Sequence, residues 1–107
     1  MFLVLWEFEV KSGCREGFQF AYGPSGDWAR LFATDPNFVE TRLLQDSLSS
    51  NKFLTLDVWQ SRRAYESFKK SHQAAYAAID KNCERFTIHE QYLGDIENFG
   101  AQTNSSE

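Results

Sequence analysis

The chain has 107 residues and a mass of 12.4 kDa, which allows one domain and leaves no room for a second. Apolar residues make up 42% of it and aromatic residues 16%, so it can bury a core and is not a disordered chain. Its net charge is −4 and it has no basic run, which argues against nucleic-acid binding. Cys14 and Cys83 have no metal-ligand spacing and are expected to be reduced thiols in a cytoplasmic protein.

The first part of the chain is predicted to form a strand and two short helices. Residues 2–10 alternate as in a strand buried on one side, and the buried set is Val4, Trp6, Phe8 and Val10. This apolar start is short and has no basic residues ahead of it, so neither a targeting signal nor a membrane span is expected. Cys14 to Tyr22 has helical spacing, and Asp27 can cap a second helix that carries Trp28.

The second part is predicted to form a hairpin, a long helix and a last strand. Phe38 to Asp46 and Lys52 to Trp59 are predicted strands, and the short polar connection between them favours an antiparallel hairpin. Ser61 is expected to cap a helix over residues 62–81. The apolar stripe of that helix follows steps of three and four residues: Tyr65, Phe68, His72, Tyr76 and Ile79. Glu84 to Leu93 is the last predicted strand.

The order of these elements is strand, helix, strand, strand, helix, strand, which predicts a ferredoxin-like α+β fold, βαββαβ. Its antiparallel sheet would carry the helices on one face. The third strand has apolar residues on both faces, Leu54, Leu56 and Val58 on one and Phe53 and Trp59 on the other. Because helices cover only one face, the other is expected to pack against a second copy in a homodimer. Residues 100–107 are polar and aperiodic, and a disordered tail is expected there.

Three segments resemble a known family. The run from Asp57 to Phe68 places a Trp at a strand end, a Ser at the helix start, and then Ala and an aromatic residue. With residues 38–44 and the pair Gly94-Asp95, it resembles the antibiotic biosynthesis monooxygenase (ABM) superfamily over about residues 2–99. The resemblance implies a dimeric α/β barrel built from one domain over residues 1–99. The family contains oxygenases, haem-degrading enzymes and members without an assigned role, so the resemblance is specific for fold and weak for activity.

Some members of this family oxidise phenolic rings without metal or flavin, and the resemblance implies which residues would take part. Trp59 and Tyr65 match a Trp and a Tyr that line the pocket of those enzymes. Thr55 stands where they usually have Asn, and no Arg near Ile79 matches their basic residue. Phe68 stands where many members carry a His, and His72 lies one turn later. The Asn and Trp of the haem-degrading members are missing, so haem is not expected.

The residues themselves leave alternatives open. Trp59 can be a core residue or a pocket wall, and Tyr65 can tie down the strand or bind a ligand. His72, between Phe68 and Tyr76, can be a packed core residue or a base, since imidazole with a pKa near 6.5 suits taking a phenolic proton. Three further residues have two possible roles: Trp28 as a lid or as packing, and Arg42 and Asp57 as an ion pair or as ligand contacts.

We expect either a cofactor-independent monooxygenase or a domain without chemistry. In the first case aromatic walls with a few polar tips would hold a small aromatic or phenolic molecule. His72, Tyr65 and Trp59 would be catalytic, and the substrate would contact Trp28, Arg42, Thr55, Asp57, Phe68 and Tyr76. No cofactor and no metal is expected, because no His/Cys/Asp cluster has ligand spacing. In the second case the same barrel would bind a small ligand or serve a structural role.

Overall fold

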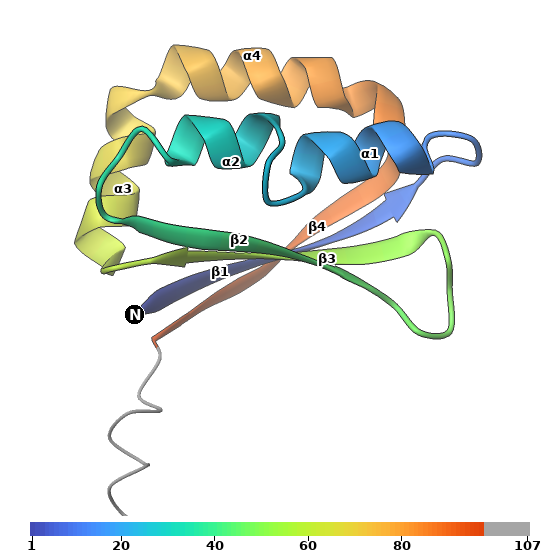
Figure 1. The fold of residues 1–107 in the computed structure, drawn as a ribbon, viewed down its shortest axis with the longest axis horizontal. Helices are drawn as coiled ribbons and strands as arrows, with labels where there is room; N and C mark the ends of the chain where they lie inside the picture. Colours follow the sequence, from blue (N-terminus) through green and yellow to red (C-terminus); the bar gives the residue numbers. More distant parts are fainter. Residues whose placement is uncertain (98–107) are drawn as a thin grey trace, which may run out of the picture.

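The computed structural model describes residues 1–97 and places four strands in one antiparallel sheet (Figure 1). The strands are β1 (Phe2–Val10), β2 (Phe38–Gln45), β3 (Lys52–Trp59) and β4 (Thr87–Glu97). Their order across the sheet is β2-β3-β1-β4, with β1 in the middle beside β3 and β4. This order confirms the predicted ferredoxin-like α+β fold. The end of the predicted domain after residue 97 and the predicted tail, residues 100–107, lie outside the described residues.

The helices all pack on one face of this sheet (Figure 1). They are α1 (Arg15–Tyr22), α2 (Asp27–Phe32), α3 (Arg62–Ser71), α4 (Gln73–Cys83) and a single 3₁₀ turn, η1 (Glu84–Phe86). The alternation of β1 explains this arrangement, because residues two apart point to the same side of a strand. Phe2, Val4, Phe8 and Val10 are each at most 3% exposed beneath the helices. None of the helices within residues 1–97 is long and apolar enough to cross a bilayer.

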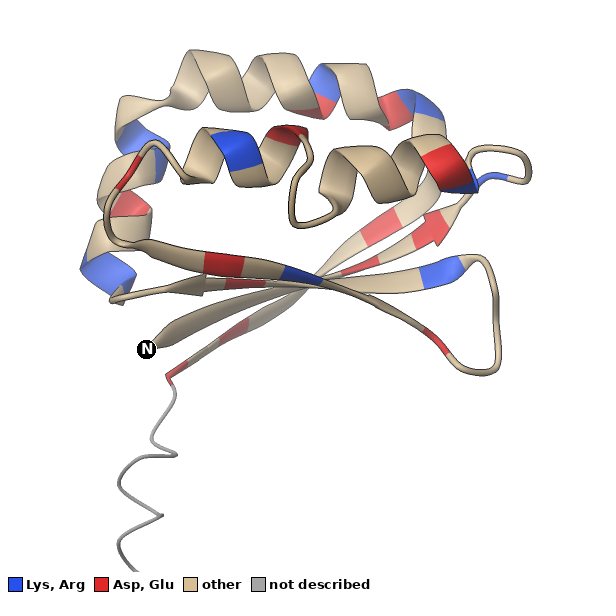
Figure 2. Ribbon diagram, viewed as in Figure 1, with Lys and Arg blue, Asp and Glu red and all other residues tan. Residues whose placement is uncertain are grey.

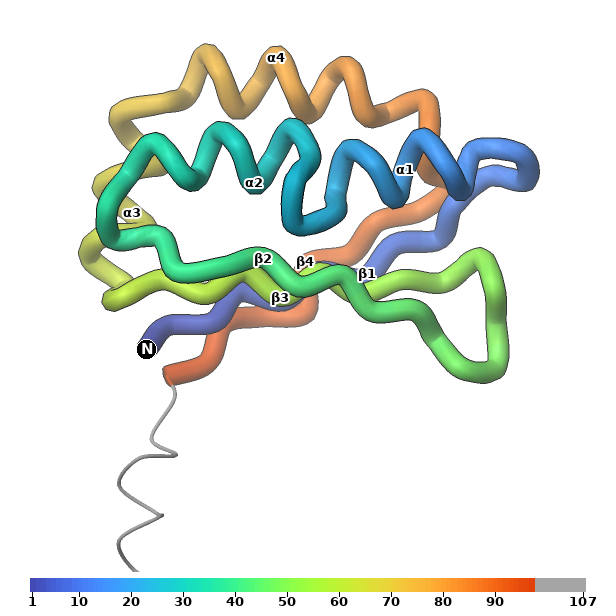
Figure 3. Tube along the Cα trace, in the orientation of Figure 1, coloured from blue at the N-terminus to red at the C-terminus, as the bar shows by residue number. Residues whose placement is uncertain are grey.

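The helix predicted over residues 62–81 is two helices. It begins as expected, with the Ser61 hydroxyl accepting a hydrogen bond from the Ala64 backbone N–H at 3.1 Å. At His72 the backbone leaves helical geometry, with φ −124° and ψ 32°, and the chain changes direction between α3 and α4 (Figure 3). The apolar steps of three and four continue across the break, because the turn keeps both helices facing the sheet. The sequence pattern therefore gives no sign of it.

The last strand begins later than predicted and is longer. Phe86 belongs to η1, where it is buried, and β4 starts at Thr87. The pairing of β1 with β4 shifts twice, first beside Ile88, which is 63% exposed, and again between Tyr92 and Gly94. Gly94, with φ +131°, has the left-handed backbone that glycine tolerates and follows the second shift.

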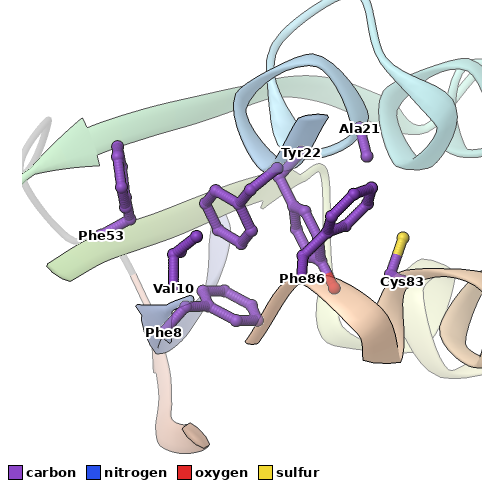
Figure 4. Close-up of a cluster of buried hydrophobic side chains, with 8 residues drawn as sticks. Phe8, Val10, Ala21, Tyr22, Phe53, Cys83 and Phe86 are labelled. Atoms are coloured by element: carbon purple, nitrogen blue, oxygen red, sulfur yellow. The ribbon is translucent and has the colours of Figure 1, made fainter. Parts of the chain in front are cut away.

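Two aromatic clusters form the core between sheet and helices. One surrounds Phe18 and Tyr22 of α1, whose rings stack at 4.4 Å, with Phe8 and Phe53 of the sheet beneath them (Figure 4). The other surrounds Trp59 and Phe68, with Phe2 and Val4 from β1. Each fully buried aromatic side chain contributes about 1.5–3 kcal/mol from the area removed from water. The clusters lie toward opposite ends of β1, and the space between them positions the site described next.

The opposite face of the sheet is apolar at its centre. In the antiparallel pairing Leu5 lies opposite Leu56 and Leu3 opposite Val58. None of the helices in residues 1–97 lies on this side (Figure 1). The surface predicted to contact a second copy is therefore present in the folded chain.

Candidate functional site

A cavity of about 480 Å³ lies between the sheet and the helices. All four strands and all four α-helices contribute to it, because their inward residues leave space between the two aromatic clusters. It is lined by Trp6, Phe8, Tyr22, Trp28, Phe32, Thr41, Thr55, Asp57, Tyr65, Lys69, Gln73, Tyr76, Ala77, Asp80 and Glu90. The volume suits a small organic molecule, and seven of the fifteen lining residues are aromatic.

Polar groups of two neighbouring strands form one part of the lining. Thr41 on β2 lies opposite Asp57 on β3, and its hydroxyl donates a hydrogen bond of 2.7 Å to Asp57 Oδ1. Thr55, two residues before Asp57, points the same way, and both threonines are buried. Removal of the Asp57 carboxylate from water raises its pKa from 3.8 to about 6, although the hydrogen bond from Thr41 acts in the opposite direction. Asp57 can therefore gain or lose a proton close to neutral pH.

Two tyrosines from α3 and α4 border the cavity with Asp57. Burial, aided by the Asp57 carboxylate, raises the pKa of Tyr65 to about 12. Burial also raises the pKa of Tyr76 far above its usual value of 10, and Tyr65 and Asp57 act in the same direction. Both phenols are therefore protonated at neutral pH and keep a hydrogen to donate.

Trp28 on α2 is part of the cavity wall. Its ring packs edge-on against Tyr76 with the centroids 5.1 Å apart, and against Phe32 at 5.9 Å. Its indole nitrogen is buried and has no hydrogen-bond partner within residues 1–97. Trp28 was predicted to be either a lid or a packing residue. In the structure its ring packs against two aromatic neighbours and also lines the cavity.

Four of the predicted site residues do not line the cavity: Trp59, Phe68, His72 and Arg42. Trp59 is fully buried in the second aromatic cluster, where Phe68 packs on it at 5.1 Å. His72 stacks on Phe68 at 4.0 Å, and its Nδ1 is 2.9 Å from the Phe68 carbonyl oxygen. The break between α3 and α4 keeps the His72 ring out of the cavity, because His72 lies at the break and its ring packs back onto α3. His72 therefore does not line the cavity, although it was predicted as a catalytic residue.

Arg42 does not pair with Asp57. On β2 it lies opposite Leu56, whereas its neighbour Thr41 lies opposite Asp57. Because successive strand residues point to opposite faces, Arg42 is on the side of the sheet without helices and is exposed. The partner of Asp57 is Thr41, and Arg42, predicted as a ligand contact, does not line this cavity.

The structure thus brings together Trp28, Thr55, Asp57, Tyr65 and Tyr76 from the predicted set. Sequence reasoning missed several lining residues, including the polar or charged residues Thr41, Lys69, Gln73, Asp80 and Glu90. Thr41 could have been found by pairing the two strands of the predicted hairpin. Asp80 lies one turn beyond Tyr76 on the same helix, which was also a readable signal. Glu90 could not have been found from the sequence, because its orientation depends on the shifted register of β4.

The fold and its aromatic cavity define a small ferredoxin-like α+β protein with a ligand-sized pocket on the helical side of its sheet. The family model of antibiotic biosynthesis monooxygenases matches residues 1–81, and the chain belongs to this family. No curated protein matches it.

Solved structures share the fold at low sequence identity. A protein from Nitrosomonas europaea proposed to be an antibiotic biosynthesis monooxygenase superposes with a TM-score of 0.70, at 14% identity over 92% of this chain and 99% of that one. SnoaB, a cofactor-independent oxygenase from Streptomyces nogalater, gives 0.68 at 17% identity over 92% and 96%. A NIPSNAP domain protein from Burkholderia xenovorans gives 0.68 at 11% identity over 94% and 96%. These likenesses show the fold.

Proposed function

We propose that the chain is a cofactor-independent monooxygenase that oxidises a small phenolic molecule in the cavity. The observation that carries the proposal is the Asp57 carboxylate, which faces the cavity with a pKa of about 6 among aromatic walls. SnoaB, which has the same fold, is a cofactor-independent oxygenase, and this supports the class of chemistry as the one to test.

Asp57 acts as the base in this proposal. Above pH 6 its carboxylate is ionised, and Thr41 holds one oxygen at 2.7 Å while the other has no hydrogen bond from residues 1–97. An ordinary phenol has a pKa of about 10, so moving its proton to Asp57 costs about 5 kcal/mol before any stabilisation by the site. The raised pKa of Asp57 reduces that cost, and the transfer leaves Asp57 neutral beside the new phenolate.

Tyr65 and Tyr76 lower the remaining cost. Both hydroxyls stay protonated at neutral pH because both pKa values are raised. Each can therefore donate a hydrogen bond to the phenolate oxygen as its charge develops. Such donors, fixed in place before the reaction, stabilise an oxyanion more strongly inside a protein than in water.

The phenolate supplies the electrons for the oxidation. Its carbon para to the oxygen forms a bond to one atom of O₂, and the other oxygen atom leaves as water after the O–O bond breaks. The two hydrogens of that water come from the phenol hydroxyl and from the attacked carbon. The product is a quinone, so one phenol and one O₂ give one quinone and one water without another reductant.

The experiment uses 1-naphthol as the probe. We expect the protein to consume one O₂ for each 1,4-naphthoquinone formed, with one atom of ¹⁸O₂ appearing in the product. Asp57→Asn should lower the rate by roughly 10²–10⁴-fold, as loss of a general base usually does. Asp46→Asn, in the exposed turn after β2, is the matched control and should keep the rate. Binding of 1-naphthol without O₂ consumption would instead identify a non-catalytic ligand-binding domain, the alternative expected from the sequence.

We also infer that the chain forms a homodimer through the sheet face without helices. Four half-buried leucines supply the apolar surface of that face: Leu3, Leu5, Leu54 and Leu56. A two-fold pair of such sheets buries the same surface on both copies and closes the assembly. The cavity lies on the opposite side of the sheet, so each copy would keep its own site.

A further inference from the structure

We propose that the ligand of this cavity is a phenol that also carries a cationic amine, about 11 Å from its hydroxyl oxygen, bound by Asp80 and Glu90. The inference rests on the proposed function, because it takes Asp57 as the group that faces the phenol. It adds the charge and the length of the substrate, which the proposed chemistry leaves open.

The charges that line the cavity favour a cation over an anion. Three carboxylates face it, those of Asp57, Asp80 and Glu90, and among the described lining residues Lys69 is the single cation. Once Asp57 has accepted the phenol proton, Asp80 and Glu90 still carry negative charge. An anionic ligand would be repelled by both of them, whereas an ammonium group would be attracted.

Asp80 and Glu90 form the acidic end of the cavity. Burial raises the pKa of Glu90, and the nearby carboxylates of Asp80 and Glu84 raise it further. These like charges gather where α4 runs above β4, and Figure 2 shows acidic positions on both elements. Repulsion between them is relieved when a cation binds, and that relief contributes to its affinity.

Aromatic rings surround the same end. Phe8 lies opposite Glu90 in the sheet, and Tyr22 packs on Phe8 with the centroids 4.8 Å apart. Glu90 also helps raise the pKa of Tyr22, which places the carboxylate beside that ring. Carboxylates together with aromatic faces are the combination that recognises organic cations, through charge and through cation–π attraction.

Lys69 lies at the other end of the cavity. Its Nζ is 5.0 Å from the ring centroid of Tyr65, the tyrosine that borders Asp57. The single lining cation is therefore beside the proposed phenol site and leaves the acidic end without a basic lining residue. The polarity of the cavity thus sets the orientation of the ligand, with the hydroxyl toward Asp57 and the amine toward Glu90.

The strand register gives the length of the ligand. Asp57 lies opposite Val4 of β1, and Glu90 lies opposite Phe8, further along the same strand. This separates them by about 13 Å along the strands and about 10 Å across them, or about 16 Å between Cα atoms. Both side chains point to the helical face of the sheet, so their carboxylates are about as far apart as their Cα atoms. A hydrogen bond of about 2.8 Å at each end then leaves about 11 Å between the two polar atoms of the ligand.

Three phenols of matched length test the proposal by calorimetric titration. They are 4-(4-aminobutyl)phenol, the neutral 4-pentylphenol and the anionic 5-(4-hydroxyphenyl)pentanoate. We expect the amine to bind roughly tenfold more tightly than the neutral phenol, and the anion more weakly than both. The ratio of the Kd of 4-pentylphenol to that of the amine is the readout, because a general change in the cavity affects both ligands.

The double variant Asp80→Asn with Glu90→Gln should bring this ratio close to one. Glu16→Gln, in the exposed first turn of α1 outside the cavity lining, is the matched control and should keep the wild-type ratio. Equal affinities of the wild-type protein for amine and neutral phenol would overturn the proposal, and so would a double variant that keeps the preference.

The two proposals fail in different ways. A preference for the amine that disappears in the double variant supports the acidic end, even where 1-naphthol is not oxidised and the monooxygenase activity is wrong. Oxidation of 1-naphthol with no preference for the amine overturns the charge selection alone. If none of the three phenols binds, the charge selection is overturned, and the oxidation of 1-naphthol decides the monooxygenase activity separately.

Discussion

The Thr41 hydroxyl donates a hydrogen bond to the Asp57 carboxylate across β2 and β3, at 2.7 Å. The two residues are cross-strand partners, so the sheet holds this contact independently of any ligand. It satisfies one oxygen of a carboxylate that has lost most of its water. The pKa of Asp57 nevertheless stays raised, because desolvation outweighs a single hydrogen bond.

This imbalance predicts that Asp57 lowers the stability of the folded protein at neutral pH. The pKa of Asp57 is about 6 in the folded protein, against 3.8 for an ordinary Asp side chain, which is the value taken for the unfolded chain. The folded chain therefore holds the proton more tightly. The cost is absent below about pH 4, grows as pH rises to about 6 and then stays constant at up to about 3 kcal/mol. Asp57→Asn should therefore raise the free energy of unfolding at pH 8 and leave it nearly unchanged at pH 4.

Urea titrations of the two proteins at both pH values measure this difference. Asn can still accept the Thr41 hydrogen bond, so packing is retained. Asp46→Asn serves as the control, since Asp46 is exposed in the turn after β2. A variant that is less stable than the wild type at pH 8 would show that the carboxylate is not desolvated.

Tyr65→Phe should lower the turnover of 1-naphthol by roughly 10²-fold or more, because it removes a donor to the phenolate. The ring remains, with its contacts to Phe2 at 5.6 Å and Trp59 at 5.7 Å, so the melting temperature should change little. Tyr92→Phe is the matched control. Its hydroxyl donates to Asp95 and does not line the cavity. Equal losses of turnover in the two variants would show that Tyr65 has no special role.

His72→Gln should change stability more than activity. Its ring stacks on Phe68 at 4.0 Å and lies outside the cavity lining, so turnover of 1-naphthol should stay within about threefold. Loss of the stacking and of the contact with the Phe68 carbonyl should cost about 1 kcal/mol of unfolding free energy. The exposed His89 gives the control, His89→Gln, which should change neither. A loss of turnover without a loss of stability would return His72 to the mechanism.

The sequence predicted those parts of the fold that follow from local periodicity. The alternation in β1 and β3 identified both strands and the faces of Val4 and Thr55, since a strand residue's face depends only on its parity. The break at His72 and the shifted register of β4 could not be predicted in this way. Both are changes of backbone direction that depend on packing against other elements, and neither alters the apolar pattern along the chain.

The site residues that follow from local periodicity could also be predicted from the sequence. Asp57 and Tyr76 were named from their places on the third strand and the long helix, and Tyr65 also from the family resemblance. All three line one cavity. His72 was predicted to accept the proton because residues 62–81 were expected to form one straight helix, with His72 on its apolar side. Glu90 was missed because its orientation follows from the irregular pairing of β4 with β1. A cavity is space that side chains leave unfilled, and no periodicity reports it.

The uncovered sheet face predicts that the protein in solution has twice the chain mass of 12.4 kDa. Leu56 lies near the middle of that face, between Leu5 on β1 and Arg42 on β2. Leu56→Lys places a charge where two sheets would meet, and removing that charge from water without a partner costs several kcal/mol. Light scattering should therefore give the dimer mass for the wild type and the monomer mass for the variant. Ala74→Lys, on the exposed side of α4, should remain a dimer. A wild-type protein of monomer mass at micromolar concentration would leave the apolar face without the proposed partner.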